Sequence, residues 1–137
     1  MADGLTADEL AYLQSRFELA RDGDVAELAA DLDAGLPANL TNSSGDSLLI
    51  LAAYHKQAEL VRALLARGAD PERVNDRGQT ALGAAVFRQS AEIVTDLLAA
   101  GADPAGGGRS ALDVARFFEL TEMLDLLVSH SGPRPDA

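Results

Sequence analysis

One segment of this sequence occurs twice, at a separation of 33 residues. Residues 45–71 read GDSLLILAAYHKQAELVRALLARGADP and residues 78–104 read GQTALGAAVFRQSAEIVTDLLAAGADP, so apolar residues align with apolar residues almost throughout. Each copy holds two short apolar stretches, joined by a polar pair and closed by Gly-Ala-Asp-Pro, which predicts two helices and a stop. A repeat of this length is typical of helical solenoids, in which each helix pair buries its apolar sides against its neighbours.

A looser copy precedes these two. Thr6 and Glu9 have the spacing of a capping box at a helix start. Leu10, Leu13 and Phe17 then recur at helical spacing, which predicts one apolar helix face. A second helix, with an aspartate at its start, completes this first unit.

A fourth copy follows, with a loop three residues shorter in front of it, so that Gly78 matches Gly108 at an offset of 30. Hydroxyl residues precede the first helix of the last three copies, and Ser47, Thr80 and Ser110 are therefore predicted N-caps. We predict an all-α solenoid in a single domain. Its four stacked helix-turn-helix units, joined by short hairpin loops and followed by a disordered tail, are expected at about 6–41, 42–74, 75–105 and 106–130, with the tail at 131–137.

Composition narrows the class of protein. The chain has no cysteine, which excludes a disulfide framework, a thiolate metal site and a cysteine nucleophile. No apolar run approaches the roughly 20 residues that cross a membrane, and the first residues lack the pattern of a secretory signal. Lys56 is the only lysine among eleven basic residues, a bias that hints at a GC-rich bacterial genome. We expect a cytoplasmic bacterial protein that does not act at a membrane.

The charge is strongly negative and uneven. The formal net charge is −11, and residues 1–35 alone hold nine acids against Arg16 and Arg21, giving −7. An acidic chain without a basic block repels phosphate backbones, so we expect no nucleic-acid partner. The simplest role of this acidity is to keep the chain soluble. The other interpretation, an acidic working surface on the first unit, stays open.

The repeated residues resemble the ankyrin repeat family, specifically its short four-repeat bacterial members. The resemblance covers about residues 10–130, and its clearest marks are the Gly-Ala-Asp closures and the Gly-Gln-Thr-Ala-Leu start of the third copy. The Thr-Pro-Leu-His signature of the family is degraded to SLLI, TALG and SALD, so we expect loop tips that are less firmly braced than usual. The resemblance implies a non-enzymatic scaffold that binds a partner protein through its loop tips and the concave face of its first helices.

Aromatic residues supply the main candidates for that face. Superposed units would place them in a row near the ends of three successive first helices, and the row holds four of only six aromatic residues. Aromatic and arginine side chains are typical interface hot spots. We interpret the row as a recognition surface, although rings that fold back to close the core would fit the same pattern. The candidates, each nine or ten residues after a loop glycine, are Tyr54, His55, Phe87, Arg88, Phe117 and Phe118.

The remaining polar candidates are weaker. Asp76 and Arg77 stand at a loop tip and would add polar specificity, but a solvated turn explains them equally well. His55 and His130 lie in different units without the spacing of metal ligands, so no metal site is predicted. No phosphate-binding motif and no nucleophile with a nearby base is present, so we expect no cofactor and no catalysis.

We therefore predict a monomeric, non-enzymatic adaptor or regulator with a protein partner. Two other classes stay open. One is an acidic inhibitor or immunity-type protein that neutralises a basic enzyme. The other is a structural accessory to a neighbouring enzyme, such as a stress-defence enzyme.

Overall fold

The computed structural model describes residues 6–130, and the predicted tail at 131–137 lies outside them. Within the described residues the chain forms helices joined by turns and loops, with only two isolated β-bridges, Thr41 with Ser47 and Gln79 with Arg109. The helices are α1 (Ala7–Asp22), α2 (Val25–Asp33), α3 (Leu48–Tyr54), α4 (Ala58–Ala66), α5 (Ala81–Phe87), α6 (Ala91–Ala99), α7 (Ala111–Phe117) and α8 (Thr121–His130).

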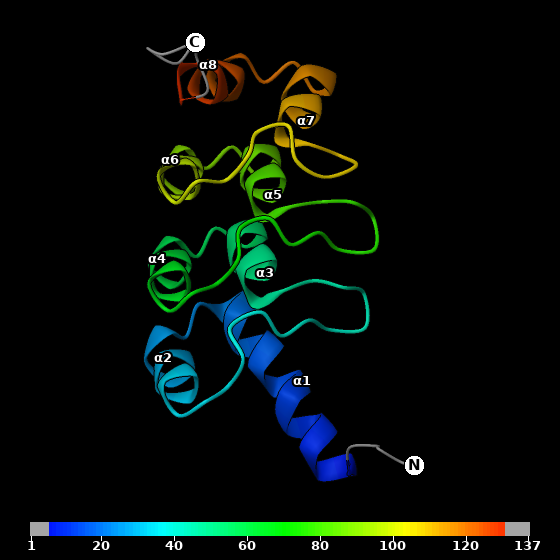
Figure 1. Ribbon diagram of the computed structural model, residues 1–137, viewed down its shortest axis with the longest axis vertical. Helices are drawn as coiled ribbons and strands as arrows, with labels where there is room; N and C mark the ends of the chain where they lie inside the picture. Colours follow the sequence, from blue (N-terminus) through cyan, green and yellow to red (C-terminus); the bar gives the residue numbers. More distant parts are fainter. Residues whose placement is uncertain (1–5, 131–137) are drawn as a thin grey trace.

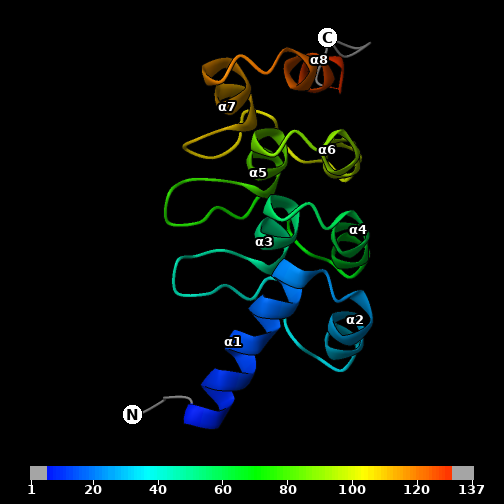
Figure 2. The same cartoon turned by 180° about the vertical axis from the view of Figure 1, so that it is seen from behind.

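The helices stack in two columns (Figure 1). An inner column holds α1, α3, α5 and α7, and an outer column holds α2, α4, α6 and α8. The loops that join one pair to the next project from the inner column, away from the outer one, and Figure 2 shows the same arrangement from behind. This is the predicted all-α solenoid of helix-turn-helix repeats, and that prediction is confirmed.

Hydroxyl side chains begin the three short inner helices, as predicted. The Oγ of Ser47 accepts a hydrogen bond from the backbone N–H of Ile50 at 3.1 Å, and Thr80 and Ser110 do the same one and two units later. All three capping residues are buried, and each satisfies a backbone N–H of the first helical turn that has no partner within the helix. The capping box at the start of α1 is also present.

A residue with positive φ, in the left-handed backbone conformation, recurs once in each repeat at the turn between the two helices. This residue is glycine in the first pair but not in the others. Residues other than glycine adopt this conformation at a cost of about 1–2 kcal/mol, so only a shared geometry explains its recurrence. The residues at these turns are Gly23 (φ 77°), Lys56 (φ 62°), Gln89 (φ 58°) and Glu119 (φ 56°).

The loop glycines occupy matching corners with one exception. Gly45 and Gly78 have φ of 79° and 78°, and Gly108 lies beside Gly78, since a Cβ on Gly78 would stand 3.3 Å from the Gly108 Cα. In the shorter third loop, however, the positive φ falls on Gly107 (φ 83°). In the loop that is three residues shorter, Gly108 therefore still lies beside Gly78, but the left-handed backbone conformation is adopted by the residue before it, Gly107.

The core between the columns is aliphatic. Leucine, isoleucine and valine side chains from both columns are fully buried, such as Leu82 on α5 and Leu97 on α6. Each contributes roughly 1.5–3 kcal/mol by leaving water. Buried alanines, such as Ala52 and Ala85, let the inner helices approach closely.

The first helix departs from the predicted apolar face. α1 has 16 residues where α3, α5 and α7 have 7, and its first half extends beyond the stack (Figures 1 and 2). Phe17 is buried, but Leu13 is half-buried and Leu10 is 47% exposed. The apolar residues of α1 do lie on one face of the helix, but no neighbouring helix covers those in its first half.

Candidate binding groove

A groove of about 520 Å³ runs between the projecting loops and the inner column. Its floor is apolar and comes from α3 and α5, where Ile50, Leu51 and Ala84 lie. Its loop side is polar and carries Arg77 and Arg109 from successive loops. A floor of packed helices with a wall of loops is a common arrangement for a binding site.

Aromatic rings form one rim of this groove. Tyr54 ends α3 and Phe87 ends α5, and their rings stack with centroids 6.2 Å apart and planes 8° from parallel. The side chains are 41% and 44% exposed. Both rings therefore lie at the surface, although more than half of each side chain is covered by its neighbours.

Phe117 and Phe118 continue the row at the end of α7. The Phe118 ring meets Phe87 edge to face at 5.4 Å, while Phe117 lies farther out, 79% exposed, with its ring 4.8 Å from Phe118. Phe117 ends α7 as Phe87 ends α5, so the spacing from the loop glycine is kept, but the ring that meets Phe87 belongs to the next residue, Phe118. We call Tyr54, Phe87, Phe117 and Phe118 the ring row.

Arg88 and His55 both lie beside Tyr54. Arg88 Nη1 donates a hydrogen bond to the carbonyl oxygen of Tyr54 at 2.8 Å, and its guanidinium carbon lies 5.2 Å from the centre of the Tyr54 ring. A cation near the last carbonyls of a helix is favourable, and so is a guanidinium over an aromatic face. The His55 ring meets Tyr54 edge-on at 5.2 Å and is exposed. Arg88 therefore holds the Tyr54 end of α3 from the neighbouring unit.

Hydrogen bonds join successive loops. Asn75 is buried, its Oδ1 accepts from the backbone N–H groups of Arg77 and Gln79, and its Nδ2 donates to Asp46 of the preceding loop at 2.9 Å. The N–H of Asp76 also donates to the Ser44 carbonyl oxygen in that loop at 3.0 Å.

Sequence reasoning singled out Asp76 and Arg77 and missed Asn75. An Asn that bonds the backbone two residues ahead is a recognised turn signal, so its local role was within reach. This network joins the first two loops, whereas the missing signature histidine led us to expect loop tips that are less firmly braced.

The comparisons with known proteins agree with this geometry. The family model for ankyrin repeats in three copies matches residues 17–107 and 49–137, which together cover most of the chain. This protein belongs to the ankyrin repeat family.

A Pseudomonas aeruginosa protein, described by its name as an ankyrin repeat protein, is 49% identical over 51 residues. Those residues are 37% of this chain and 30% of the relative, so the match spans less than a third of the relative's length. A bacterial relative fits the compositional bias of the sequence. Ankyrin repeats generally mediate protein–protein interactions and are generally not enzymes.

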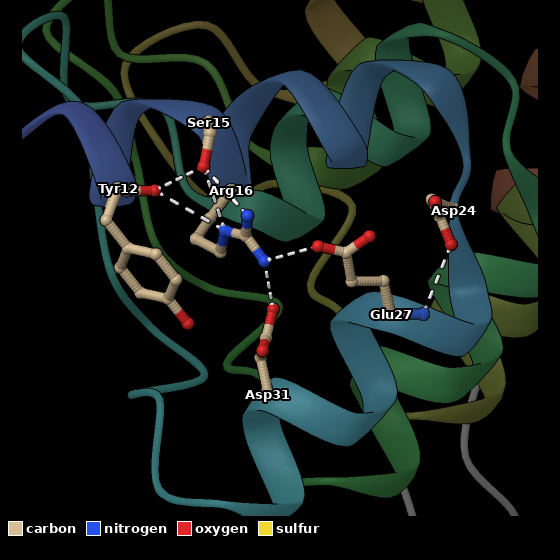
Figure 3. Close-up of polar contacts among 6 residues, drawn as sticks. All are labelled: Tyr12, Ser15, Arg16, Asp24, Glu27 and Asp31. Carbon is tan, nitrogen blue, oxygen red and sulfur yellow. Dashed lines mark hydrogen bonds and ion pairs between the residues drawn. The ribbon is translucent and has the colours of Figure 1, made fainter.

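Away from the groove, Arg16 clamps the first ankyrin helix pair together (Figure 3). Its guanidinium Nη1 contacts Glu27 at 3.0 Å and also Asp31, both on α2, and its carbon lies 4.4 Å from the Tyr12 ring centre. Desolvation lowers the pKa of Arg16, but the hydrogen bonds that it donates to Asp31 and Glu27 outweigh this effect and hold that pKa above its ordinary value. This cluster is internal to one pair, so we assign it to stability.

Among residues 6–130, no three histidine, aspartate or glutamate side chains gather where they would hold a metal ion. No helix in that range has the length and apolar character to cross a bilayer.

Proposed function

We propose that this ankyrin repeat protein is an adaptor or regulator without catalysis of its own, and that it captures a partner protein in the groove. The ring row carries the proposal. Its four side chains are 41–79% exposed and lie in contact with one another. Clustered exposed rings mark interaction sites, and aromatic residues dominate the energy of most interfaces.

The geometry also lowers the cost of binding. Arg88 holds the Tyr54 end of α3, and Asn75 ties two loops that face the rings. Side chains and loops that are ordered before binding lose less entropy when the partner arrives. A preformed rim and a preformed wall therefore favour recognition of a segment that lies between them.

A photo-crosslinking experiment tests the proposal. A benzophenone amino acid replaces Phe87 at the rim in one variant and Val128 of α8 in a control, since Val128 is also exposed, at 53%, but lies in the outer column. After irradiation in the source cells, the Phe87 variant is expected to give a discrete covalent adduct with a second protein. An adduct pattern shared by both positions, or found only at Val128, would count against the groove.

The acidic first unit supports a second candidate, an inhibitor of a basic enzyme. Four of its carboxylates already face an arginine, which reduces what they offer a partner; these are Glu18, Glu27, Asp31 and Asp33. Asp8 and Asp22 remain exposed without an ion pair to any described residue. Loss of partner capture in the Asp8→Asn, Asp22→Asn double variant, with the ring row intact, would favour this candidate over the groove.

A further inference from the structure

The basic residues of this acidic protein differ in whether an acid faces them. Arginines that tie the helices of the stack together are neutralised by ion pairs. Arg16 contacts Glu27 and Asp31 between α1 and α2, and Arg62 contacts Glu92 and Asp96 between α4 and α6 at 2.7 and 2.9 Å. Arg67 contacts Asp33 at 3.0 Å. The charges of these three arginines are therefore balanced by carboxylates of the same molecule.

The arginines on the loop side of the groove have no such partner. Arg77 and Arg109 are exposed, and neither forms an ion pair with any residue in the range 6–130. Among the residues that the structure describes, the Arg77 side chain donates only to the side-chain amide oxygen of Gln79, at 3.2 Å, and the Arg109 side chain forms no hydrogen bond. Two guanidinium groups thus face the groove with their charge available.

The two loops that carry these arginines are in register. The Arg109 N–H donates to the Gly78 carbonyl oxygen at 3.0 Å, and Gln79 pairs with Arg109 in a parallel bridge. Arg21 adds a third positive charge to the groove lining, although it contacts Glu18 on its own helix. The single carboxylate of the lining, Asp46, accepts a hydrogen bond from Asn75. Positive charge therefore prevails in the groove of a chain whose net charge is −11.

We propose that the groove recognises an extended acidic segment of the partner protein, with carboxylates at Arg77 and Arg109 and a large apolar side chain against the ring row. This inference rests on the proposed function of the groove and adds the chemistry of the partner. A guanidinium binds a carboxylate through two parallel hydrogen bonds, which lysine does not match. Charge inside a walled groove also acts more strongly than the same charge on a flat surface.

The acidic surface elsewhere limits what else fits. A nucleic acid carries its charges along its whole length, so the part outside the groove would run against carboxylates. A protein segment with two or three acidic residues carries negative charge only over the part that lies in the groove. Repulsion by the rest of the surface is screened beyond about 8 Å at physiological ionic strength, while contacts at the arginines are shorter than that.

A displayed library of random peptides, selected on the immobilised full chain, tests the proposal. The enriched peptides are expected to combine a net negative charge with a large apolar residue. Their affinity should fall ten- to a hundredfold in the Arg77→Glu, Arg109→Glu variant. The Arg73→Glu, Arg116→Glu variant is the matched control, because both residues are exposed, form no ion pair with another described residue and do not line the groove. It should bind within a factor of two of the parent.

The other outcomes separate this inference from the proposed function. Uncharged peptides that depend on Phe87 and ignore the arginines would overturn the inference and leave the groove as a binding face. A lack of any enriched peptide, or peptides that ignore both the rings and the arginines, would overturn both.

Two more measurements cover other occupants. Tight binding of single-stranded DNA that is lost with Arg77 and Arg109 would replace the peptide by a nucleic acid. The first half of α1, with Asp8, Glu9 and exposed Leu10, is itself acidic and apolar. Sedimentation that shows self-association abolished by Leu10→Ser would make a second copy the occupant. Circular dichroism melting confirms that each variant is folded.

Discussion

Two truncations on the same helix test whether the ring row belongs to the surface or to the core. Leu82 and Phe87 stand at opposite ends of α5, which packs against α3, α6 and α7. Leu82 is fully buried, whereas Phe87 is 44% exposed. The variants Leu82→Ala and Phe87→Ala remove comparable apolar side chains from one helix in these two environments.

The expected losses in free energy of unfolding differ clearly. Leu82→Ala leaves a cavity between helices that cannot easily close, so about 3–5 kcal/mol is expected, the upper part of the range for such changes. Full burial of a phenylalanine contributes roughly 1.5–3 kcal/mol, and little more than half of Phe87 is buried. With a weak contribution from the stack on Tyr54, the loss for Phe87→Ala should be about 1–2 kcal/mol.

Urea unfolding followed by circular dichroism measures both losses. With a slope of about 2 kcal/mol per molar urea, the midpoint should fall by about 0.5–1 M for Phe87→Ala and by about 2 M for Leu82→Ala. The slope should stay unchanged in both variants. If Phe87→Ala lost as much stability as Leu82→Ala, the ring would be a core residue, and the argument for a binding rim would fail.

Three further changes probe the frame around the groove. Arg16→Ala should cost about 1–2 kcal/mol in urea unfolding, because Asp31 loses its charged hydrogen bond in a half-buried place; a variant as stable as the parent would contradict the assigned clamp. Thr80→Ala should cost about 1 kcal/mol through loss of the N-cap, while Thr80→Ser should match the parent in the same assay. Asn75→Ala should raise amide exchange at Asp76, whose N–H bonds the preceding loop, and unchanged exchange there would show that Asn75 does not brace the loops.

Much of the fold could be predicted from the sequence because the same helix-pair pattern occurs several times along the chain. The caps at Ser47, Thr80 and Ser110 follow from local chemistry, since a hydroxyl before an apolar stretch serves the backbone three residues on. The stacking order follows from the period. Both depend on residues close in sequence or on exact repetition.

The departures arise where neither condition holds. Leu10 has the spacing of a buried residue, but the repeat does not show that α1 is longer than α3, the helix that it packs against, so that Leu10 stays exposed. Phe117 and Phe118 are adjacent at the end of α7, and their spacing alone does not show that Phe118 is the one whose ring meets Phe87. Arg16 is buried only because two carboxylates of another helix reach it, and a lone arginine in a helical pattern indicates a solvated side chain.

The shorter loop before α7 also makes the two ends of the groove unlike. Toward α3, a full-length loop tied to its neighbour through Asn75 encloses the floor. Toward α7, the wall is three residues shorter, and a second hollow of about 340 Å³ opens beside Phe117 and Phe118. In the proposed groove, a peptide laid along the stack would meet a longer wall at one end and a shorter wall at the other. We therefore expect a partner segment with its sequence reversed to bind less well.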